Sequence, residues 1–526
     1  MATVSSDGAA AVAADDDVYP TGRIDNAMVL KTMVLSVTMR FDAVLEPSKL
    51  HAALCTLLDT GDWRRLGGRL RRPARDETPQ VLKIHVPRLH TASHPPVAYS
   101  YADFSGVSIA EHELGRHLPG VNGRDAALYA AAEDFREFAA ARDLPDTIDG
   151  FLVPGEDRPV LSLRITGFAD ATLVAVAVPH ILMDAMALGE LMGAWSLALA
   201  GRMDEVPPVL GAREDVAYDA ADAELASAQG GEKEPWALQP VYLAGFSFVL
   251  FVVRFLWAIL TEPAMESRVL YLPKGTLDRM RAGAIDDIAA QAPRDDDNAA
   301  DTAKPWISEG DVLFAWACRV VSLAQGTKPR PINAHNALNL RNRLPQTTPP
   351  PPPPTDGDKQ PAAGVFVRNL VALSYLPVSP AEARGPVGLV AAKYRAVLAT
   401  QASPTQVLWM LRALRACVDA GKDANIVCGA PPTGELLTMT NWIKADFARA
   451  VDFSPAVVVD GVAAAGERGR LGRIVYLHSQ LHARSSTVRN TLGAVGKDVH
   501  GNMWLGGYFP PRTWDVVQKE LDKMNQ

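Results

Sequence analysis

The sequence predicts an α/β fold made of two layered domains. The chain has 526 residues, a length that suggests more than one domain. Short apolar, β-branched runs alternate with helical patterns in both halves of the chain, which favours sheets flanked by helices. No repeat with a period of about 20 to 50 residues is visible, so a solenoid is excluded.

Composition divides the chain into four segments. Residues 1–18 are rich in Ala, Ser and Asp and have no basic start or apolar core, so we expect a disordered tail and no signal peptide. The acidic, Ala-rich stretch Asp204–Glu234 is typical of a surface linker. We therefore expect an N-terminal domain over 19–225, a linker with an apolar helix over 226–265 and a C-terminal domain over 266–526.

Hydrophobic periodicity predicts the elements of each half in order. In the first half we expect strands at Ala27–Met39, Gln80–Val86, Val160–Ile165 and Thr172–Val178, and helices at Pro47–Leu58 and Ala185–Ala200. In the second half we expect strands at Val269–Leu272, Pro331–Leu340, Leu370–Leu376, Leu436–Asn441, Ala456–Val462, Gly472–Leu477 and Met503–Phe509, and helices at Lys274–Ala284, Gly310–Ala324, Val387–Thr400, Thr405–Val418 and Thr513–Lys523. Asp286–Lys304 and the proline-rich Pro345–Pro361 are expected to be loops.

The chain is organised around the stretch Ala171–Ala200. Its apolar run leads through Pro179 to His180, Asp184 follows four residues later, and a helical pattern then begins. A rigid strand end of this kind can aim a catalytic group, and a neutral imidazole can take up a proton and return it. Asp184 could orient His180 directly, or it could hold the turn by pairing with an arginine.

Charge and cysteine content exclude several classes of protein. The net charge of −8 and the absence of a basic stripe argue against nucleic-acid binding. Four cysteines without CxxC spacing are typical of reduced thiols in an intracellular protein, and we expect a cytoplasmic location.

Motifs for other chemistries are missing. There is no GxxxxGK[ST], no convincing GxGxxG and no GxSxG, which argues against nucleotide hydrolysis, dinucleotide chemistry and a serine hydrolase. His478 and His482 are four residues apart, but no third ligand stands out, so we expect no metal.

The most apolar segment is Val241–Leu260, which contains Arg254 as its only charged residue. Three interpretations compete. It could be a buried or surface-packed helix, a helix lying in a membrane interface with Arg254 reaching toward the headgroups, or a transmembrane span.

Several motifs, in a consistent order, resemble those of one family. His180-Ile181-Leu182-Met183-Asp184 resembles the HxxxD motif of the BAHD-type, CoA-dependent acyltransferases, in their broad fungal branch. Further matches follow the family's order at Leu66–Leu70, Glu309–Ala324, Asn339–Leu344, Thr440–Trp442 with Asp452–Phe453, and Gly496–Trp514. Together they span about Asp25 to Leu521, nearly the whole chain.

The resemblance implies two chloramphenicol-acetyltransferase-like domains, each a mixed β-sheet flanked by helices, with a central tunnel between them. It implies transfer of an acyl group from acyl-CoA to a hydroxyl, or less readily an amine, of a small acceptor from fungal secondary metabolism. Acyl-CoA would be a co-substrate, no cofactor would be bound, and the protein would be a monomer. A related carrier-protein-dependent transfer would use the same histidine.

The resemblance also implies roles for individual residues. His180 would be the general base, whereas Asp184 would be structural and paired with Arg341, or in second place with Arg343. Asp452 would be structural, away from the chemistry. Asn369 and Thr440 are candidates for contacts with the oxyanion or the substrate.

Two departures leave alternatives open. The family's DFGWG segment reads Asp452-Phe453-Ser454-Pro455-Ala456 here, so a catalytically inactive, small-molecule-binding relative is an alternative. Val241–Leu260 favours a membrane-associated lipid or sterol acyltransferase as a third interpretation.

Overall fold

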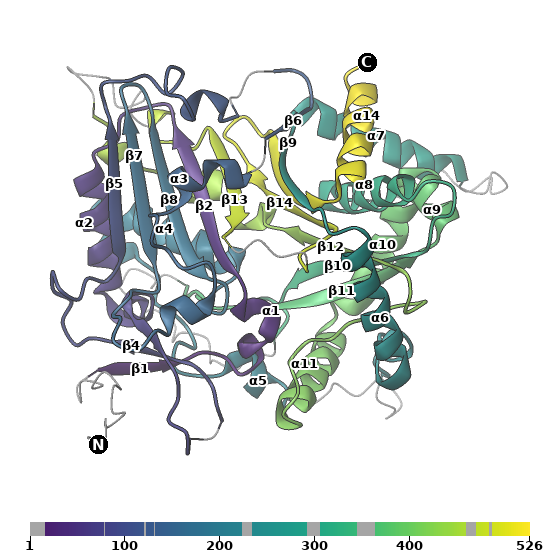
Figure 1. Cartoon of the computed structure of the whole chain (residues 1–526), viewed down its shortest axis with the longest axis horizontal. Helices are drawn as coiled ribbons and strands as arrows, with labels where there is room; N and C mark the ends of the chain where they lie inside the picture. The colour runs from purple at the N-terminus through teal and green to yellow at the C-terminus, as the bar shows by residue number, and fades with distance from the viewer. Residues whose placement is uncertain are drawn as a thin grey trace, which may run out of the picture.

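Two large mixed sheets, each with its own helices, form the body of the molecule (Figure 1). The structure is a computed structural model that describes residues 16–77, 79–119, 123–130, 132–223, 234–291, 306–344, 363–458, 470–482 and 487–526. The mixed-sheet, two-domain α/β fold expected from the sequence is confirmed.

The first sheet has five strands in the order β13-β2-β8-β7-β5. Its strands are β2 (Val34–Phe41), β5 (Ala98–Phe104), β7 (Ser162–Phe168), β8 (Thr172–Pro179) and β13 (Tyr476–Leu481). Only the pair of β5 and β7 is parallel among these described pairings. Every residue of β8 is buried, which explains its uninterrupted apolar sequence.

The second sheet has seven strands in the order β11-β10-β12-β14-β15-β9-β6. Its strands are β6 (Ala127–Tyr129), β9 (Glu266–Leu272), β10 (Ile332–Asn339), β11 (Val371–Val378), β12 (Glu435–Asn441), β14 (Thr491–Lys497) and β15 (Met503–Phe509). The three strands β10, β12 and β14 run parallel, and the other described pairings are antiparallel.

The two halves of the chain exchange one strand each. β6 comes from the first half but pairs with β9 of the seven-stranded sheet, whereas β13 comes from the second half but pairs with β2 of the five-stranded sheet. The expected segments 19–225 and 266–526 therefore each complete the other's sheet. This exchange ties the two domains together.

A small third sheet corrects the extent of the expected tail. β1 (Asp17–Pro20) pairs with β4 (Lys83–Val86), which also pairs with β3 (Arg69–Arg71). Asp17 and Val18 thus belong to a strand and not to a tail, because their backbone groups pair with β4. Residues 1–15 lie outside the described part of the chain.

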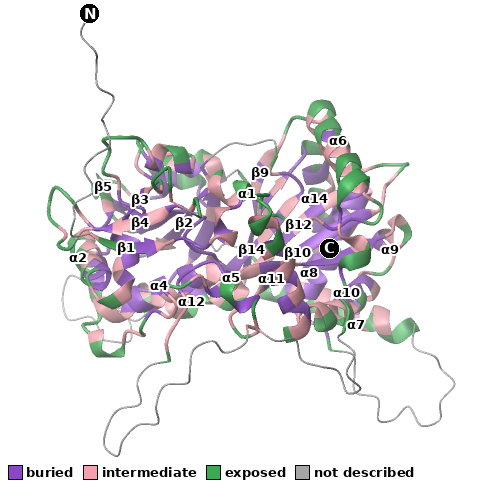
Figure 2. Ribbon diagram, turned by 90° about the horizontal axis from the view of Figure 1, so that it is seen from below, coloured by how far each residue is buried: buried purple, intermediate pink, exposed green. Residues whose placement is uncertain are grey.

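Helices cover both sheets (Figures 1 and 2). On the five-stranded sheet, α4 (Ala185–Leu199) lies on the face of Phe41, since Phe453 contacts both Phe41 and Trp195 of α4. The remaining helices are α1 (Met28–Lys31), α2 (Pro47–Leu58), α3 (Arg136–Ala139), α5 (Val216–Ala220), α6 (Gly245–Thr261), α7 (Lys274–Gln291), α8 (Glu309–Ala324), α9 (Pro380–Arg384), α10 (Val387–Gln401), α11 (Pro404–Asp419), α12 (Phe447–Ala450) and α14 (Pro511–Met524).

Several expected elements differ from the structure. The strand expected from Gly472 begins only at Tyr476, and the stretch Asp204–Glu234, expected to be a surface linker, contains α5, which buries Val216, Tyr218 and Ala220. The strand expected at Ala27–Met39 begins only at Val34, because Met28–Lys31 form a helical turn. The helix expected to end at Ala284 continues to Gln291. Where a strand was expected from Ala456, Ser454–Ala456 form a 3-10 turn instead, in which Pro455 occupies a first-turn position. Pro349–Pro354 lie outside the described residues.

The apolar segment forms a surface helix. α6 buries only Ala258, and much of its ribbon is coloured as exposed in Figure 2. Its exposed residues include the large apolar Phe246 and Trp257. Arg254 does not reach outward as the interfacial interpretation expected: its guanidinium lies 3.4 Å from Glu435 and its side chain is 19 % exposed. Within the described residues, none of the helices combines the length and apolar character that crossing a bilayer would require.

Candidate functional site

His180 follows the last residue of β8 and is held by its backbone on both sides. Its N–H donates to the Met33 carbonyl at 2.9 Å, just before β2 begins. Its carbonyl accepts from Nδ2 of Asn369 at 2.8 Å. The residue as a whole is half-buried, and these two contacts fix its backbone at the end of the strand. This is the placement that the sequence predicted for a group aimed by a strand end.

Asp184 uses its carboxylate entirely for structure. As the N-cap of α4 it accepts from the backbone N–H of Ala187 at 2.9 Å, and it also accepts from the N–H of Leu370 at 2.9 Å. Arg341 adds two parallel hydrogen bonds, each 2.9 Å long. A carboxylate has about four lone-pair sites, and these four donors fill them. Of the two alternatives for Asp184, the contacts favour the one in which it holds the turn.

The pairing of Asp184 with Arg341 is the one that the resemblance implied. Both side chains are only 10 % exposed. The guanidinium also donates to the carbonyls of Phe366 and Arg368, so it joins α4 to the segment before β11. Arg343 instead donates to the carbonyl of Asn339. The pair therefore binds the turn after His180 to the second half of the chain.

The environment of His180 keeps its imidazole neutral. Burial lowers the pKa of His180 from its ordinary value, and the nearby charge of Asp184 opposes this shift only in part. Nδ1 is buried and has no hydrogen-bond partner among the described residues. A neutral ring can accept a proton, and no carboxylate is engaged with Nδ1.

The two candidates for oxyanion contacts differ in position. Asn369 holds the backbone of His180 through Nδ2, whereas its buried Oδ1 has no described partner. Thr440 lies on β12, opposite Gly493 of β14, and no described hydrogen bond connects it with His180. The observed contact of Asn369 positions the backbone of His180. The sequence pattern could not distinguish this role from a contact with the substrate.

Asp452 lies at the far end of α4 from His180. Its carboxylate pairs with Arg473 at 2.8 Å and caps the turn at the N–H of Ser454, and its own N–H donates to the hydroxyl of Ser196 on α4. Phe453 is fully buried. The altered segment after Asp452 is therefore accommodated in an ordered turn.

His478 and His482 lie on or directly after β13 and not on a helix. Both are buried, and burial lowers the pKa of each to about 4. In the part of the chain that the structure describes, no three His, Cys, Asp or Glu residues are grouped closely enough to hold a metal ion.

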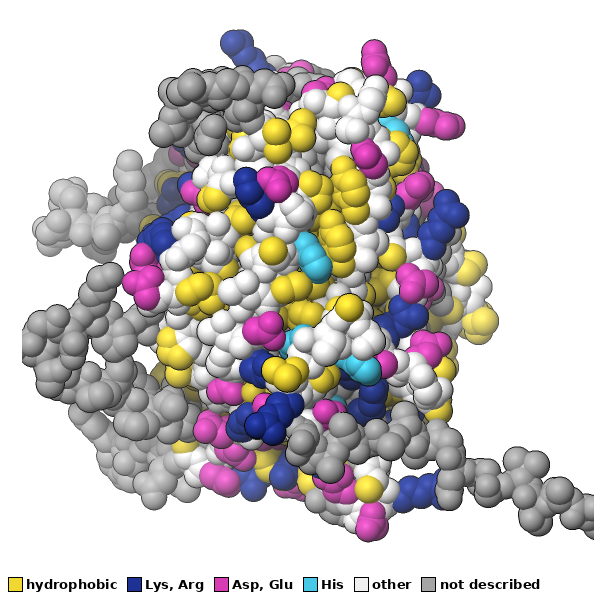
Figure 3. Space-filling model, turned by 90° about the vertical axis from the view of Figure 1, so that its left-hand side faces the viewer, with side chains coloured by type: hydrophobic (Ala, Val, Ile, Leu, Met, Phe, Trp, Pro, Cys, Tyr) yellow, Lys and Arg dark blue, Asp and Glu magenta, His cyan; other side chains and the backbone are white. Residues whose placement is uncertain are grey.

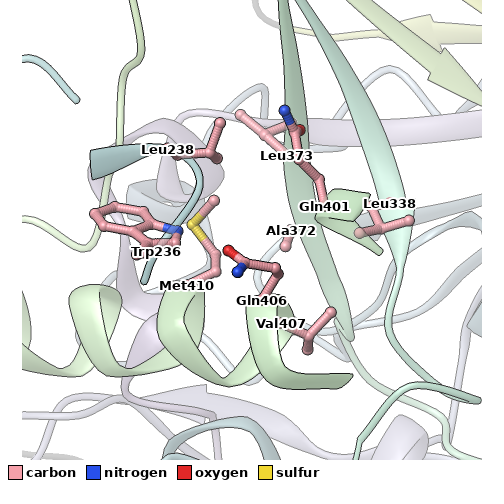
Figure 4. A pocket seen from close by; sticks show the side chains of 9 residues that line it. All are labelled: Trp236, Leu238, Leu338, Ala372, Leu373, Gln401, Gln406, Val407 and Met410. Atoms are coloured by element: carbon pink, nitrogen blue, oxygen red, sulfur yellow. The ribbon is translucent and has the colours of Figure 1, made fainter. Parts of the chain in front are cut away.

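Two other surfaces do not resemble a reactive site. A hollow beside α11 is mostly apolar, and its two glutamines, Gln401 and Gln406, are hydrogen-bonded to the protein (Figure 4). On the face shown in Figure 3, basic and acidic side chains are interspersed. The residues that line the hollow do not include His180 or its described hydrogen-bond partners.

Sequence reasoning missed part of what positions His180. The carbonyl of Met33 and the N–H of Leu370 act through the backbone, so their side chains carry no signal. A second feature was visible but not interpreted: β13 places His478 and Gln480 at alternating positions, and both side chains are buried.

Known proteins resemble the chain along its whole length. No protein-family model matches it. It is 33 % identical to the O-acetyltransferase PaAT-2 of Phomopsis amygdali over 97 % of this chain and 98 % of that protein. It is 30 % identical to the acetyltransferase BOT5 of Botryotinia fuckeliana over 97 % of this chain and 91 % of that protein. Among solved structures, F. graminearum TRI101 complexed with coenzyme A and T-2 mycotoxin has the same fold, with a TM-score of 0.61 at 11 % identity over 96 % of this chain and 98 % of that one.

Proposed function

Because the chain belongs to the BAHD-type, CoA-dependent acyltransferases, we propose that His180 is the general base of its reaction. The protein is an O-acyltransferase that moves an acyl group from acyl-CoA to a hydroxyl of a small molecule. The observation that carries the assignment is the placement of His180: its backbone is fixed at the end of β8, burial lowers the pKa of its imidazole, and the neighbouring carboxylate of Asp184 is fully occupied by other donors.

The proposed reaction needs only this one base. Nε2 or Nδ1 of His180 accepts the proton of the acceptor hydroxyl as the oxygen attacks the thioester carbonyl. A tetrahedral oxyanion forms, the bond from carbon to sulfur breaks, and CoA leaves as a thiolate. The imidazolium then returns its proton to the thiolate, so the products are an ester and CoA. Holding both substrates at one base supplies much of the rate through proximity.

The neighbouring residues act through position. Asp184 and Arg341 fix the turn after His180, and Asn369 fixes its carbonyl. Thr440 remains the proposed donor to the oxyanion, and Asp452 the proposed support at the far end of α4. A tunnel between the two domains would bring acyl-CoA and the acceptor to His180 from opposite sides.

The test of the function is direct. Purified protein is incubated with acetyl-CoA and a panel of secondary-metabolite alcohols, CoA thiol is measured, and esters are identified by mass spectrometry. We expect alcohol-dependent release of CoA that matches the amount of ester formed. Release in the absence of ester would mean that the acyl group goes to water and would contradict transfer to an alcohol. No release with any acyl-CoA would favour the inactive, small-molecule-binding alternative.

We propose further that α6 rests on a membrane surface. Its 17 residues span about 25 Å, enough to lie flat in the headgroup region, and Arg254 anchors it to the body through Glu435. Glu435 also pairs with Arg330 and accepts from Asn490, so this anchor is rigid. The outward side presents apolar side chains, with Phe246 and Leu260 each 76 % exposed. Such a continuous apolar patch is costly in water.

Vesicle flotation tests this contact. We expect the protein to float with phosphatidylcholine vesicles, and the triple variant Val253→Glu, Trp257→Glu, Leu260→Glu to remain in solution, because it places charge on the exposed side of α6. The matched control Met28→Glu, Leu89→Glu, Val107→Glu changes exposed apolar residues elsewhere and should float like the wild type. Equal flotation of both variants would contradict the proposal. Gel filtration should show a monomer, and a dimer lost in the α6 variant would mean that the helix pairs with a second copy.

A further inference from the structure

Asn369 contacts His180 through its side-chain amide. Its Nδ2 donates to the backbone carbonyl of His180 at 2.8 Å, and the residue is 3 % exposed. A carbonyl oxygen only accepts hydrogen bonds, so this contact settles which end of the amide faces it. The amide oxygen Oδ1 is bonded to the same carbon as Nδ2, and it therefore lies close to His180 as well.

Two polar atoms beside this contact have no partner. Nδ1 of His180 and Oδ1 of Asn369 are both buried, and neither forms a hydrogen bond with a described residue. The imidazole faces its own carbonyl, which only Nδ1 can approach because Nε2 lies on the far side of the ring. The amide bound to that carbonyl is therefore on the Nδ1 side. One hydrogen bond from Nδ1–H to Oδ1 would satisfy both atoms, whereas leaving them unpaired is unfavourable.

The electrostatics of the ring agree with this arrangement. Burial lowers the pKa of His180, and four groups oppose the shift: the carbonyl of His180 itself, the carboxylate of Asp184, the side chain of Asn369 and the carbonyl of Met183. Asp184 is the charged group among them, and its carboxylate is occupied by Arg341 and by backbone N–H groups. The amide of Asn369 is therefore the side-chain acceptor that remains available to the ring.

The neighbours of Asn369 hold its amide in place. The carbonyl of Arg368 accepts from the guanidinium of Arg341 at 2.8 Å, and the N–H of Leu370 donates to the carboxylate of Asp184 at 2.9 Å. The residues on both sides of Asn369 are thus tied to the ion pair that fixes the turn after the histidine. The amide is therefore kept beside the imidazole and cannot easily turn away from it.

A hydrogen bond at Nδ1 decides which nitrogen of the ring is the base. A neutral imidazole carries its proton on one nitrogen, and only the other nitrogen can accept one. With Nδ1–H donated to Oδ1 of Asn369, the free lone pair is on Nε2, which points away from the backbone. When Nε2 takes the proton of the acceptor hydroxyl, the ring becomes positively charged and its hydrogen bond to the amide oxygen strengthens. The proton then leaves from Nε2 to the CoA thiolate, and Nδ1 keeps its own proton throughout.

We propose that Asn369 is a positioning residue that holds the proton of His180 on Nδ1, so that Nε2 is the base. This rests on the proposed function, because it specifies the atom of His180 that removes the proton of the acceptor hydroxyl. Two backbone carbonyls, those of His180 and Met183, also face the ring and compete for the same role. Substitution at position 369 separates the amide from both of them, since it leaves the backbone groups unchanged.

Acetyl transfer is measured over a range of pH for the wild type, Asn369→Leu and Asn369→Asp. Leucine matches asparagine in size and removes both polar atoms, whereas aspartate keeps an acceptor and makes it an anion. We expect kcat of Asn369→Leu to fall by about 10- to 100-fold, because the base is no longer fixed, and the KM for acetyl-CoA to stay the same. The pH at which the rate is half-maximal should move down in Asn369→Leu, which loses a group that raises the pKa of His180, and up by about 1 pH unit in Asn369→Asp.

Asn336→Leu is the matched control. Asn336 lies on β10 and is also buried, its Nδ2 donates to the hydroxyl of Tyr394 at 2.8 Å, and its Oδ1 has no described partner. It has no described contact with His180, so we expect its pH profile to match that of the wild type, whatever its stability. A pH profile of Asn369→Leu that also matches the wild type, or a shift of both Asn369 variants in the same direction, would overturn the proposal.

A second measurement does not depend on turnover. The nitrogen NMR signals of isotope-labelled histidine distinguish a protonated from an unprotonated ring nitrogen, and those of His180 are the ones missing from His180→Ala. Above neutral pH we expect a protonated Nδ1 and an unprotonated Nε2 in the wild type, and a mixture of the two forms in Asn369→Leu. A protonated Nε2 in the wild type would mean that another acceptor holds the proton, and the proposal would be wrong. If the expected signals appear but no alcohol is acetylated, the amide fixes the ring as inferred and it is the proposed reaction that fails.

Discussion

Replacing His180 by alanine is expected to lower kcat for acetyl transfer by about 10³-fold, the usual contribution of a positioned general base. Without the imidazole no described side chain takes its position at the end of β8, and the hydroxyl must lose its proton to water. The fold should persist, because Asp184 keeps its four hydrogen bonds and the contacts of residue 180 to Met33 and Asn369 are made by the backbone. Transfer is measured with the acceptor that reacts fastest, and the fold by circular dichroism.

The control for this variant is His500→Ala, which removes an exposed histidine and should retain full activity. The pH profile of the wild type gives a second check. The base must be neutral to accept a proton, and burial lowers the pKa of His180. The rate should therefore hold as the pH falls to the ordinary imidazole value of 6.5 and decline only below it. Near-normal turnover by His180→Ala would contradict the assignment.

Replacing Arg341 by methionine is expected to lower the free energy of unfolding by about 3 to 5 kcal/mol, because it leaves the buried carboxylate of Asp184 without its cation. The variant also loses the hydrogen bonds from the guanidinium to Phe366 and Arg368, so the segment before β11 loosens from α4. The loss is measured by urea denaturation, with activity recorded in parallel. We expect activity to fall as well, since the turn after His180 loses its support.

Arg343→Met is the matched control at the same strand end. Its side chain donates one hydrogen bond to the carbonyl of Asn339 and forms no described ion pair with a carboxylate, so the cost should be about 1 kcal/mol. The double variant Asp184→Asn, Arg341→Met should recover part of the stability lost by Arg341→Met, because it also removes the unpaired charge. An Arg341→Met protein as stable as the control would show that the ion pair does not hold the turn.

The sequence contained enough to predict the fold class and the location of the histidine. Thr172–Pro179 is apolar throughout, which predicts a buried strand, and Ala185–Leu199 has helical spacing, so the position of His180 between them followed. The partner of Asp184 could be predicted only through the family resemblance, because Arg341 is 157 residues away along the chain.

Other features could not be predicted because they depend on long-range contacts. The exchange of β6 and β13 is decided by pairing between segments far apart in sequence, and local patterns carry no information on which sheet a short strand joins. Helix α6 has the composition of a buried or membrane helix, yet it lies on the surface, with Arg254 turned toward Glu435 of β12. Its exposure is therefore a property of the packed molecule.

The sequence by itself determined the strand, the turn and the helix around His180, because these are set by the apolar pattern of neighbouring residues. Only the tertiary structure decided what Asp184 does. Its four donors come from its own helix, from Leu370 and from Arg341, and they leave nothing for the imidazole. The physical reason is that a carboxylate can accept only about four hydrogen bonds. Its role therefore depends on which donors the fold places beside it, and these donors come from distant parts of the chain.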